Sequence, residues 1–240
     1  MRAAALSRKH NSAKGLADTQ TQAYGVVGGF FVSADVDHRK LLKELLRRKS
    51  LVRGTFTLAS GRRSDYYLDC KLTTLDPEGS VLTGYTILEL LESHGIHPDA
   101  IGGPTIGADP IVAAVAAVSY LERKPVPAFL IRKERKTHGC EKQIEGLELK
   151  PGLKVAVVDE VCTTGGSTMD AIAAAEEAGL VVTAVVSLVD REEGGSDKIR
   201  QRYAYYSVFT ARELLEDDPR GEPASHKAPK NTFQSATKDQ

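Results

Sequence analysis

A buried strand, a sharp turn and the start of a helix follow one another in residues 153–168, whose sequence is LKVAVVDEVCTTGGST. The nearly continuous apolar run from Leu153 to Val158 is typical of a strand covered on both faces, as strands of a parallel sheet are. The small residues TTGGST then lead into a segment, MDAIAAAEEAG, that favours a helix. A strand that turns directly into a helix is the repeating unit of α/β proteins, so this segment points to that fold class.

The rest of the chain continues this alternation of strands and helices. It extends over about 150 residues and predicts an α/β fold with a mainly parallel sheet. In such sheets ligands bind at the carboxyl ends of the strands, so the functional site is expected there. The expected helices cover residues 78–94, 111–121 and 168–178, and the expected strands lie around residues 100–101, 126–131 and 181–189.

Two further helices are expected near the two ends of this region. The side chain of Asp37 can cap a helix that carries apolar residues on one face, among them Leu42 and Leu45. Towards the other end, Thr210 and Glu213 have the spacing of a capping box and predict a short helix.

Two carboxylates, Asp159 and Glu160, stand where the apolar run ends. Glycines let the backbone N–H groups of the following turn face a ligand, hydroxyls add donors, and the helix start adds a positive dipole, so the segment suits a phosphate group. Carboxylate oxygens can accept hydrogen bonds from the hydroxyls of a sugar or bind a hydrated magnesium ion. An ordinary strand-to-helix turn with hydroxyl caps is the alternative. The segment has neither the GK[ST] of a nucleoside-triphosphate loop nor the GxGxxG of a dinucleotide site.

Residues 153–168 closely resemble the signature of the type I phosphoribosyltransferases, which hold the ribose and 5′-phosphate of phosphoribosyl pyrophosphate (PRPP). The resemblance implies a mainly parallel sheet flanked by helices, with a small hood subdomain. It also implies that Asp159 and Glu160 are catalytic and that the whole segment binds PRPP. The PRPP-binding residues expected here are Asp159, Glu160, Val161, Cys162, Thr163, Thr164, Gly165, Gly166 and Ser167.

Residues 54–71, GTFTLASGRRSDYYLDCK, have the alternation and the central turn of a β-hairpin. A plain surface hairpin would explain this pattern. The segment is, however, similar to the amino-terminal hood of the orotate phosphoribosyltransferases, whose FTLxSGRxSxYY pattern covers the pyrimidine. That similarity implies orotate as the base, with Tyr67 and Leu68 beside it. Many members of the family have a lysine at the position of Ala59.

The segment RKERKTHGCEKQIEG, residues 132–146, is rich in Lys and Arg. A solvated charged loop is the usual explanation for such a run. The segment also resembles the mobile catalytic loop of the orotate phosphoribosyltransferases, which reaches into the active site of the neighbouring subunit. By this resemblance Arg132, Lys133, Lys136 and His138 bind PRPP at its pyrophosphate, Lys136 and His138 also act in catalysis, and the protein is a homodimer. Cations suit a leaving pyrophosphate because negative charge builds on its oxygens.

Arg191 follows the strand expected over residues 181–189. For a single arginine, a surface ion pair is the alternative to a role in binding. The matching segment of the orotate phosphoribosyltransferases makes Arg191 a candidate contact of the orotate carboxylate, which a guanidinium can hold with two parallel hydrogen bonds. The same resemblance makes Thr163 an orotate contact and places the loop GGPTIGADP, residues 102–110, near the pyrophosphate and ribose, where backbone contacts are expected.

Length and composition narrow the remaining choices. At 240 residues, the chain has room for one substantial core, so we expect one domain over residues 36–218, a flexible extension over 1–35 and a disordered tail over 219–240. Lys plus Arg and Asp plus Glu are 32 each, so no overall field favours nucleic acid or a membrane. No apolar run approaches the ~18 residues of a membrane span. Three cysteines without metal-ligand spacing indicate neither a disulfide framework nor a zinc site and fit a reducing cytoplasm.

Four motifs in the order expected of the orotate phosphoribosyltransferases extend from Val36 to Glu213. The resemblance implies transfer of the phosphoribosyl group from PRPP to orotate, which gives orotidine 5′-monophosphate and pyrophosphate in pyrimidine (UMP) biosynthesis. Mg²⁺ is expected as the cofactor, carried by PRPP and not by a metal site of the protein. Two alternatives stay open: a purine phosphoribosyltransferase, which should lack the hood and the basic loop, and a regulator that senses PRPP without catalysis.

Overall fold

The computed structural model describes residues 25–27, 30–32, 36–57, 63–134 and 143–216. The chain divides into two compact units, Met1–Val36 and Asp37–Gln240. In the first unit, strands β1 (Gly25–Val27) and β2 (Phe30–Val32) form an antiparallel pair. The second unit contains the remaining described helices and strands. The tail boundaries expected from the sequence stay predictions.

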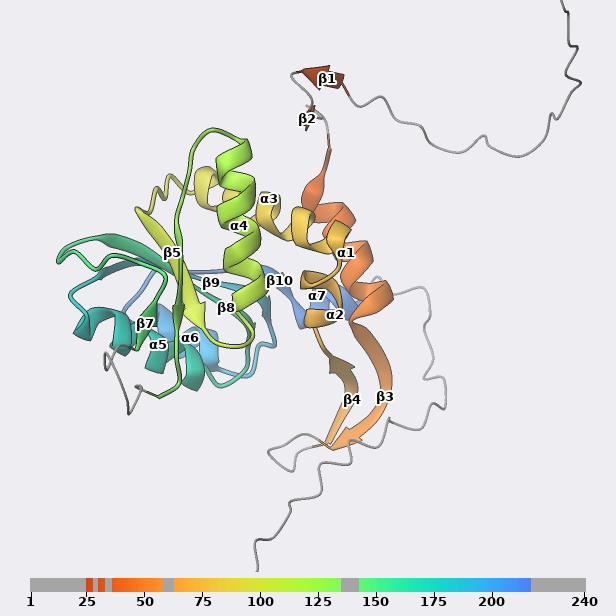
Figure 1. Ribbon diagram of the computed structural model, residues 1–240. Coiled ribbons are helices and arrows are strands. Elements are labelled where there is room, and N and C mark those ends of the chain that lie inside the picture. The colour runs from red at the N-terminus through yellow and green to blue at the C-terminus, as the bar shows by residue number, and fades with distance from the viewer. Residues whose placement is uncertain (1–24, 28–29, 33–35, 58–62, 135–142, 217–240) are drawn as a thin grey trace, which may run out of the picture. The chain divides into compact units, whose positions relative to one another are not determined.

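A six-stranded sheet forms the centre of the second unit (Figure 1). Its strand order is β10-β9-β8-β5-β6-β7, and neighbouring strands are parallel except for β6 and β7, which are antiparallel. The predicted α/β fold with a mainly parallel sheet is therefore confirmed. The strands of this sheet are β5 (Ala100–Pro104), β6 (Ala128–Ile131), β7 (Ile144–Glu145), β8 (Lys154–Cys162), β9 (Val181–Asp190) and β10 (Tyr205–Thr210).

Two hydrophobic cores cover the two faces of this sheet. Alternate residues of β8 enter different cores: Val155 and Val157 pack with residues of α5 and α6, whereas Ala156 and Val158 pack with residues of α3 and α4. Because successive side chains of a strand point to opposite faces, burial on both faces explains the continuous apolar run. The helices that supply these residues are α3 (Pro77–Ser93), α4 (Asp109–Leu121), α5 (Gly166–Glu177) and α6 (Gly195–Arg200).

A β-hairpin projects away from the central sheet, as Figure 1 shows. It consists of β3 (Leu51–Thr57) and β4 (Arg63–Leu68), which pair antiparallel, and we call these two strands the hood hairpin. Helix α1 (His38–Lys49) precedes it, and helix α2 (Lys71–Thr74) follows. The predicted hairpin is thus confirmed. The predicted cap of α1 is confirmed too, since Asp37 Oδ1 accepts a hydrogen bond from the Lys40 N–H at 2.9 Å.

Two element boundaries near the central turn differ from expectation. Strand β8 continues beyond the two carboxylates to Cys162, because it pairs with β9 as far as Cys162 opposite Asp190. Asp159 and Glu160 therefore lie within the strand and not after it. Helix α5 begins at Gly166, two residues earlier than expected, so the turn between β8 and α5 is shorter than its sequence suggests.

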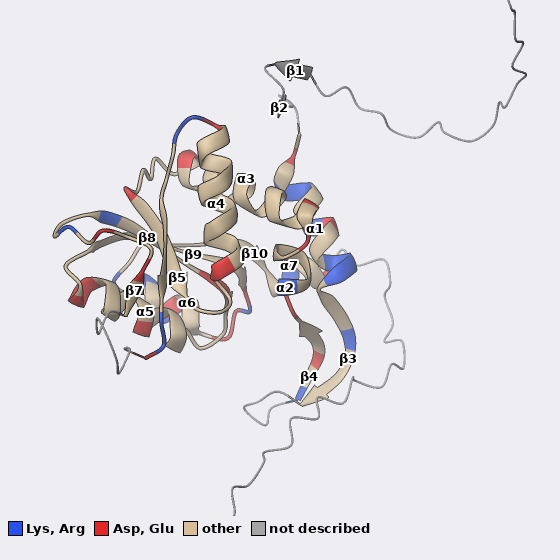
Figure 2. Ribbon diagram, in the orientation of Figure 1, with Lys and Arg blue, Asp and Glu red and all other residues tan. Residues whose placement is uncertain are grey.

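Charges of both signs are interspersed along the described helices and strands (Figure 2). This distribution accords with the equal numbers of basic and acidic residues, 32 each. Because neither sign of charge is in excess, the electrostatics of the molecule depend on local groups of charges.

Among the described residues, no helix has both the length and the apolar character to cross a membrane.

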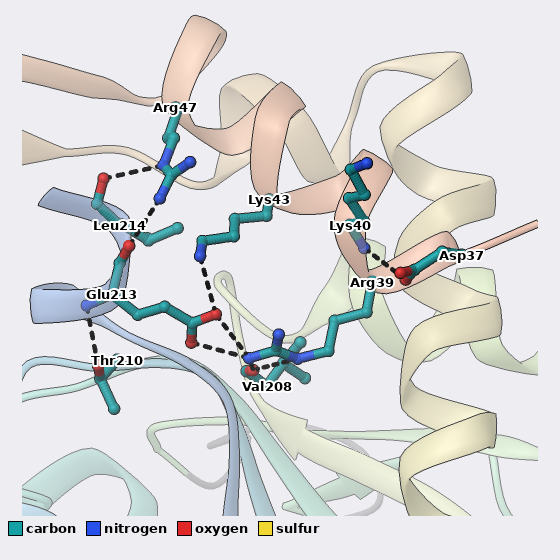
Figure 3. A network of polar contacts seen from close by, with 9 residues as sticks. All are labelled: Asp37, Arg39, Lys40, Lys43, Arg47, Val208, Thr210, Glu213 and Leu214. Atoms are coloured by element: carbon teal, nitrogen blue, oxygen red, sulfur yellow. Dashed lines mark hydrogen bonds and ion pairs between the residues drawn. The ribbon is translucent and has the colours of Figure 1, made fainter. Parts of the chain in front are cut away.

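Helix α7 (Ala211–Glu216) is held against α1 by polar contacts drawn in Figure 3. Glu213 accepts hydrogen bonds from Arg39 Nη2 at 2.8 and 2.9 Å and pairs with Lys43 Nζ at 3.1 Å. Arg39 also donates to the Val208 carbonyl at 2.9 Å, and Arg47 donates to the Glu213 carbonyl at 2.7 Å. These contacts join the first and the last of the helices that the structure describes in the second unit.

Only half of the expected capping box forms at the start of α7. Thr210 Oγ1 accepts a hydrogen bond from the Glu213 N–H at 3.1 Å, as predicted. In a full capping box the Glu213 carboxylate would also turn back to the Thr210 N–H. Here that carboxylate instead binds Arg39 and Lys43 on α1, which are close only in the folded protein.

We expect Glu213→Gln to lower the free energy of unfolding by about 1–2 kcal/mol near neutral pH, because Arg39 and Lys43 lose their shared carboxylate. Burial raises the pKa of Glu213, but hydrogen bonds from Arg39 and Lys43 outweigh burial and hold this pKa below its ordinary value of 4.5. A carboxylate of this kind stabilises the fold above its unfolded pKa, and the stabilisation is lost as the pH falls through the folded pKa. Urea unfolding should therefore show the difference between wild type and variant shrinking below about pH 5.

Glu148→Gln is the matched control for this measurement. Glu148 is 85% exposed and pairs with Lys150 at 3.6 Å. We expect its substitution to change the unfolding free energy by less than about 0.5 kcal/mol. Equal losses in the two variants, or a difference for Glu213→Gln that grows in acid, would contradict the role given to the contacts between α1 and α7.

Candidate active site

The carboxylate of Asp159, on β8, is held by the first turn of α5. Its Oδ2 accepts hydrogen bonds from Thr168 Oγ1 at 2.6 Å and Ser167 Oγ at 3.1 Å, and its Oδ1 accepts one from the Glu160 N–H at 2.8 Å. Burial raises the pKa of Asp159 above its ordinary value, although these three hydrogen bonds favour the charged form. Asp159 is therefore a nearly buried carboxylate in a fixed orientation.

The turn between β8 and α5 leaves the start of the helix open to a ligand. Gly165 has φ of +77°, in the left-handed region that favours glycine, and as the N-cap residue it has no side chain to cover the helix N–H groups. The turn packs closely on the residues after β9: the Gly195 N–H donates to the Thr163 carbonyl at 3.0 Å, and a Cβ at Gly195 would lie 2.5 Å from that oxygen. Thr164, Gly166 and Ser167 are exposed. Exposed N–H and hydroxyl donors at a helix start suit a phosphate group.

Glu160 is held by a different set of neighbours from Asp159. Lys71 Nζ, on α2, donates to both Glu160 carboxylate oxygens at 3.0 Å and lies 2.9 Å from Asp69 Oδ1. Burial raises the pKa of Glu160, and the hydrogen bonds and charge of Lys71 oppose this effect. Burial lowers the pKa of Lys71, but its bonds to Asp69 and Glu160 outweigh burial and raise this pKa to about 12. Lys71 was not among the predicted site residues, because nothing in the sequence indicates its contact with β8.

Arg191, the first residue after β9, lines a pocket of about 590 Å³ together with residues of the hood hairpin. Its guanidinium carbon lies 4.6 Å from the centroid of the Tyr66 ring, and its Nη2 donates to Ser64 Oγ at 3.4 Å. Its Nε lies 2.9 Å from Glu193 Oε1, and only 10% of the side chain is exposed. A ring, a hydroxyl and a carboxylate thus fix a guanidinium at the edge of a pocket, where it can bind a planar anion.

All of these groups lie at one edge of the sheet. Strands β9, β8, β5 and β6 are neighbours in this order and run parallel, so their carboxyl ends meet. The acidic pair is near the end of β8, Arg191 follows β9, and Arg132 follows β6. The loop after β5 reaches the same place, since a Cβ at Gly107 would lie 2.8 Å from Glu160 Oε2. The predicted position of the site at this edge agrees with the topology.

An orotate phosphoribosyltransferase from Aquifex aeolicus (strain VF5) is 46% identical to the chain over 181 residues, which make up 74% of this chain and 97% of that protein. The chain belongs to the orotate phosphoribosyltransferase family. No family model matches it. Two crystal structures of the orotate phosphoribosyltransferase of Mycobacterium tuberculosis H37Rv have the same fold. The complex with Fe(III) dicitrate has a TM-score of 0.66 and 37% identity, and the match covers 74% of this chain and 99% of that chain. The complex with PRPP has a TM-score of 0.62 and 35% identity, and the match covers 74% of this chain and 98% of that chain.

Membership of the orotate phosphoribosyltransferase family confirms the predicted type I phosphoribosyltransferase fold. Within the hood hairpin, however, the residues that contact Arg191 are Ser64 and Tyr66, which the sequence did not single out. The ring centroid of Tyr67 lies 5.7 Å from that of Phe56, and Tyr67 is 47% exposed. Leu68 packs against the hydrophobic core that contains residues of α3 and α4. Neither Tyr67 nor Leu68 lines the pocket beside Arg191. Alternation along β4 explains the position of Tyr67, which points to the face opposite Tyr66. Leu68 lies on the same face as Tyr66, but it is the last residue of the strand and packs against the core.

Two predicted PRPP-binding residues turn their side chains into the protein. Cys162 is 1% exposed and belongs to the hydrophobic core that contains residues of α5 and α6. Val161 packs against the other core, which contains residues of α3 and α4. Any contact that they make with a phosphate therefore comes from the backbone. At the end of β6, Arg132 and Lys133 are exposed, and Arg132 Nη1 lies 3.7 Å from Glu145 Oε1. The remaining predicted loop residues, Lys136 and His138, and the departure at Ala59 lie outside the described residues.

Proposed function

We propose that the chain transfers the 5-phosphoribosyl group of PRPP to orotate, giving orotidine 5′-monophosphate and pyrophosphate, as in pyrimidine biosynthesis. The observation that carries this function is the fixed guanidinium of Arg191 in a pocket beside the hood hairpin, at the same sheet edge as the open turn after β8. A planar carboxylate matches the guanidinium, and a phosphate matches the turn. The two sites are adjacent, as transfer from a sugar phosphate to a carboxylated base requires.

In this proposal the turn residues Thr163 to Ser167 hold the 5′-phosphate through N–H groups and hydroxyls, while Asp159 and Glu160 face the ribose. The bond between the anomeric carbon and the pyrophosphate oxygen breaks, and its electron pair leaves with the pyrophosphate. The sugar then carries positive charge that the two carboxylates stabilise until a ring nitrogen of orotate forms the new bond and loses its proton to the released pyrophosphate. Thr163 and Arg191 position orotate, with Tyr67 and Leu68 of the hood hairpin also assigned to the base.

The leaving pyrophosphate is assigned to the basic loop, with Arg132, Lys133, Lys136 and His138 as its contacts. Positive charge from these residues would offset the negative charge that builds on the pyrophosphate oxygens. We propose that Mg²⁺ enters the site with PRPP as part of the substrate. Among the described residues there is no group of three or more His, Cys, Asp or Glu side chains that could hold a metal ion.

We also propose that the protein acts in the cytoplasm as a homodimer in which the basic loop completes the partner's site. Large apolar side chains are exposed on the two helices that follow the hood hairpin in sequence: Leu72 and Leu75 of α2 are 56% and 69% exposed, and Val81 of α3 is 49% exposed. Exposed apolar groups of this kind are typical of surfaces that another chain covers. Cys70 and Cys162 are buried free thiols, as suits a reducing compartment.

The decisive experiment follows the consumption of orotate by absorbance with purified protein. We expect turnover only when PRPP and Mg²⁺ are both present, and we expect chelation of Mg²⁺ to stop it. Turnover of adenine or hypoxanthine without turnover of orotate would assign the chain to the purine enzymes. Binding of PRPP in calorimetry without turnover of any base would instead support a regulator, and either result would overturn the proposed function.

A further inference from the structure

Lys71 follows the hood hairpin in sequence and contacts Glu160 of β8. It is the first residue of α2, which begins shortly after β4 ends at Leu68. Its Nζ lies 3.0 Å from each carboxylate oxygen of Glu160 and 2.9 Å from Asp69 Oδ1. The Lys71 side chain is 37% exposed, whereas that of Glu160 is 11% exposed. The ammonium group thus reaches from the base of the hood hairpin to a carboxylate on the central sheet.

Glu160 needs a cation at this position. Burial is the largest influence that disfavours its charged form, and the negative charges of Asp69 and Asp159 act in the same direction. Lys71 opposes all three with two hydrogen bonds and its positive charge. On another side, the backbone of the loop after β5 restricts the carboxylate, because a Cβ at Gly107 would lie 2.8 Å from Glu160 Oε2. Lys71 and this loop together fix the orientation of Glu160.

We propose that Lys71 is a positioning residue of the active site, which holds the Glu160 carboxylate in place and joins it to the hood hairpin. The inference rests on the proposed function, in which Glu160 faces the ribose of PRPP. Lys71 contacts Glu160 and Asp69, so it acts through Glu160 and not on the reacting atoms. Without Lys71, the Glu160 carboxylate would turn to another partner or take up a proton, and either change removes negative charge from the sugar site.

A double-mutant cycle tests this role. Lys71→Met should lower kcat about ten-fold and raise the KM for PRPP by no more than about three-fold, because the lost negative charge acts mainly on the transition state. Lys71→Arg should recover kcat to within about three-fold of wild type, because a guanidinium can also donate two hydrogen bonds to a carboxylate. In a Glu160→Gln background, Lys71→Met should lower kcat by less than about two-fold, because the group through which Lys71 acts has already lost its charge.

Lys49→Met is the matched control. The Lys49 side chain is 35% exposed, close to the value for Lys71, and it forms an ion pair with Asp76, the N-cap residue of α3. Its loss removes a similar ion pair outside the site. We expect Lys49→Met to lower the midpoint of thermal unfolding while kcat stays within about two-fold of wild type.

Equal losses of kcat from Lys71→Met in the wild-type and Glu160→Gln backgrounds would overturn the proposal, as would a loss no greater than that of Lys49→Met. Failure of the wild-type protein to turn over orotate would overturn the proposed function instead. The same cycle would then be measured by calorimetry with PRPP, where Lys71→Met should weaken binding about two-fold or more in the wild-type background and not in the Glu160→Gln background. Equal weakening of PRPP binding in the two backgrounds would reject the role of Lys71, independently of whether the proposed function holds.

Discussion

Asp159→Asn should lower kcat by about 10²–10³-fold, because it removes a fixed negative charge from the place where the sugar becomes positive. Only 7% of Asp159 is exposed, so solvent water cannot take over the role of the lost carboxylate in stabilising the positive sugar. Asparagine has the same size but keeps one acceptor oxygen, so its NH2 group must face either the Glu160 N–H or the hydroxyls of Ser167 and Thr168. This weakens the hydrogen bonds on that side, at a cost of about 1 kcal/mol in stability. The measurement is the initial rate of orotate consumption, with thermal unfolding to show that the variant is folded.

Asp99→Asn is the matched control, because Asp99 also uses its carboxylate to accept a backbone hydrogen bond from the central sheet. Its Oδ2 accepts from the Lys154 N–H at 2.9 Å at the amino end of β8, opposite to the end that carries Asp159. We expect kcat to change by less than about two-fold in this variant. An Asp159→Asn protein that is folded and turns over orotate at nearly the wild-type rate would remove the carboxylate from the mechanism.

The sheet could be predicted from the sequence because its strands carry their own signal. Residues 155–158 of β8 are apolar without interruption, and the structure divides them alternately between two cores. That pattern requires helices on both faces, which in turn requires crossover connections and a parallel sheet. The position of the site follows from the same logic, because the carboxyl ends of parallel strands meet at one edge.

The ends of the strands, and the contacts between residues far apart in sequence, could not be predicted in this way. Strand β8 extends through both carboxylates because β9 offers partners as far as Asp190, and no local property of the residues after Val158 reveals this. Likewise, Glu213 has the spacing of a capping box, yet its carboxylate binds Arg39 and Lys43 of a helix far away in sequence. In each case a contact that exists only in the folded protein outweighs the local preference.

The contacts around the site depend on tertiary structure in the same way. The sequence pattern of the hood hairpin singled out Tyr67, but whether Tyr66 or Tyr67 faces Arg191 depends on the register with β3, where Arg53 pairs with Tyr66 and Val52 with Tyr67. A shift of one residue would exchange the two faces. The pairing of Lys71 with Glu160 joins residues 89 positions apart, so no spacing rule could have found it.

Arg191→Met should lower kcat/KM for orotate by at least about 10²-fold and remove the preference for orotate over uracil, which has no carboxylate. The structure explains why the effect should be large. The guanidinium is already held over the Tyr66 ring and beside Glu193, so it meets the orotate carboxylate without loss of further side-chain freedom. Arg191→Lys should recover only a small part of the activity, because an ammonium group is a point charge and cannot offer two parallel hydrogen bonds.

Arg200→Met provides the control, because Arg200 has the same kinds of contact at another place. Its guanidinium carbon lies 4.8 Å from the Tyr205 ring centroid, and its Nη1 lies 3.2 Å from Asp197 Oδ1. We expect the ratio of kcat/KM values for orotate and uracil to stay within about two-fold of wild type in this variant. If Arg191→Met lowered the rates with orotate and uracil equally, Arg191 would hold the hood hairpin in place and not read the carboxylate. A loss of kcat/KM with orotate but not with uracil would show that the guanidinium itself determines the specificity for the base.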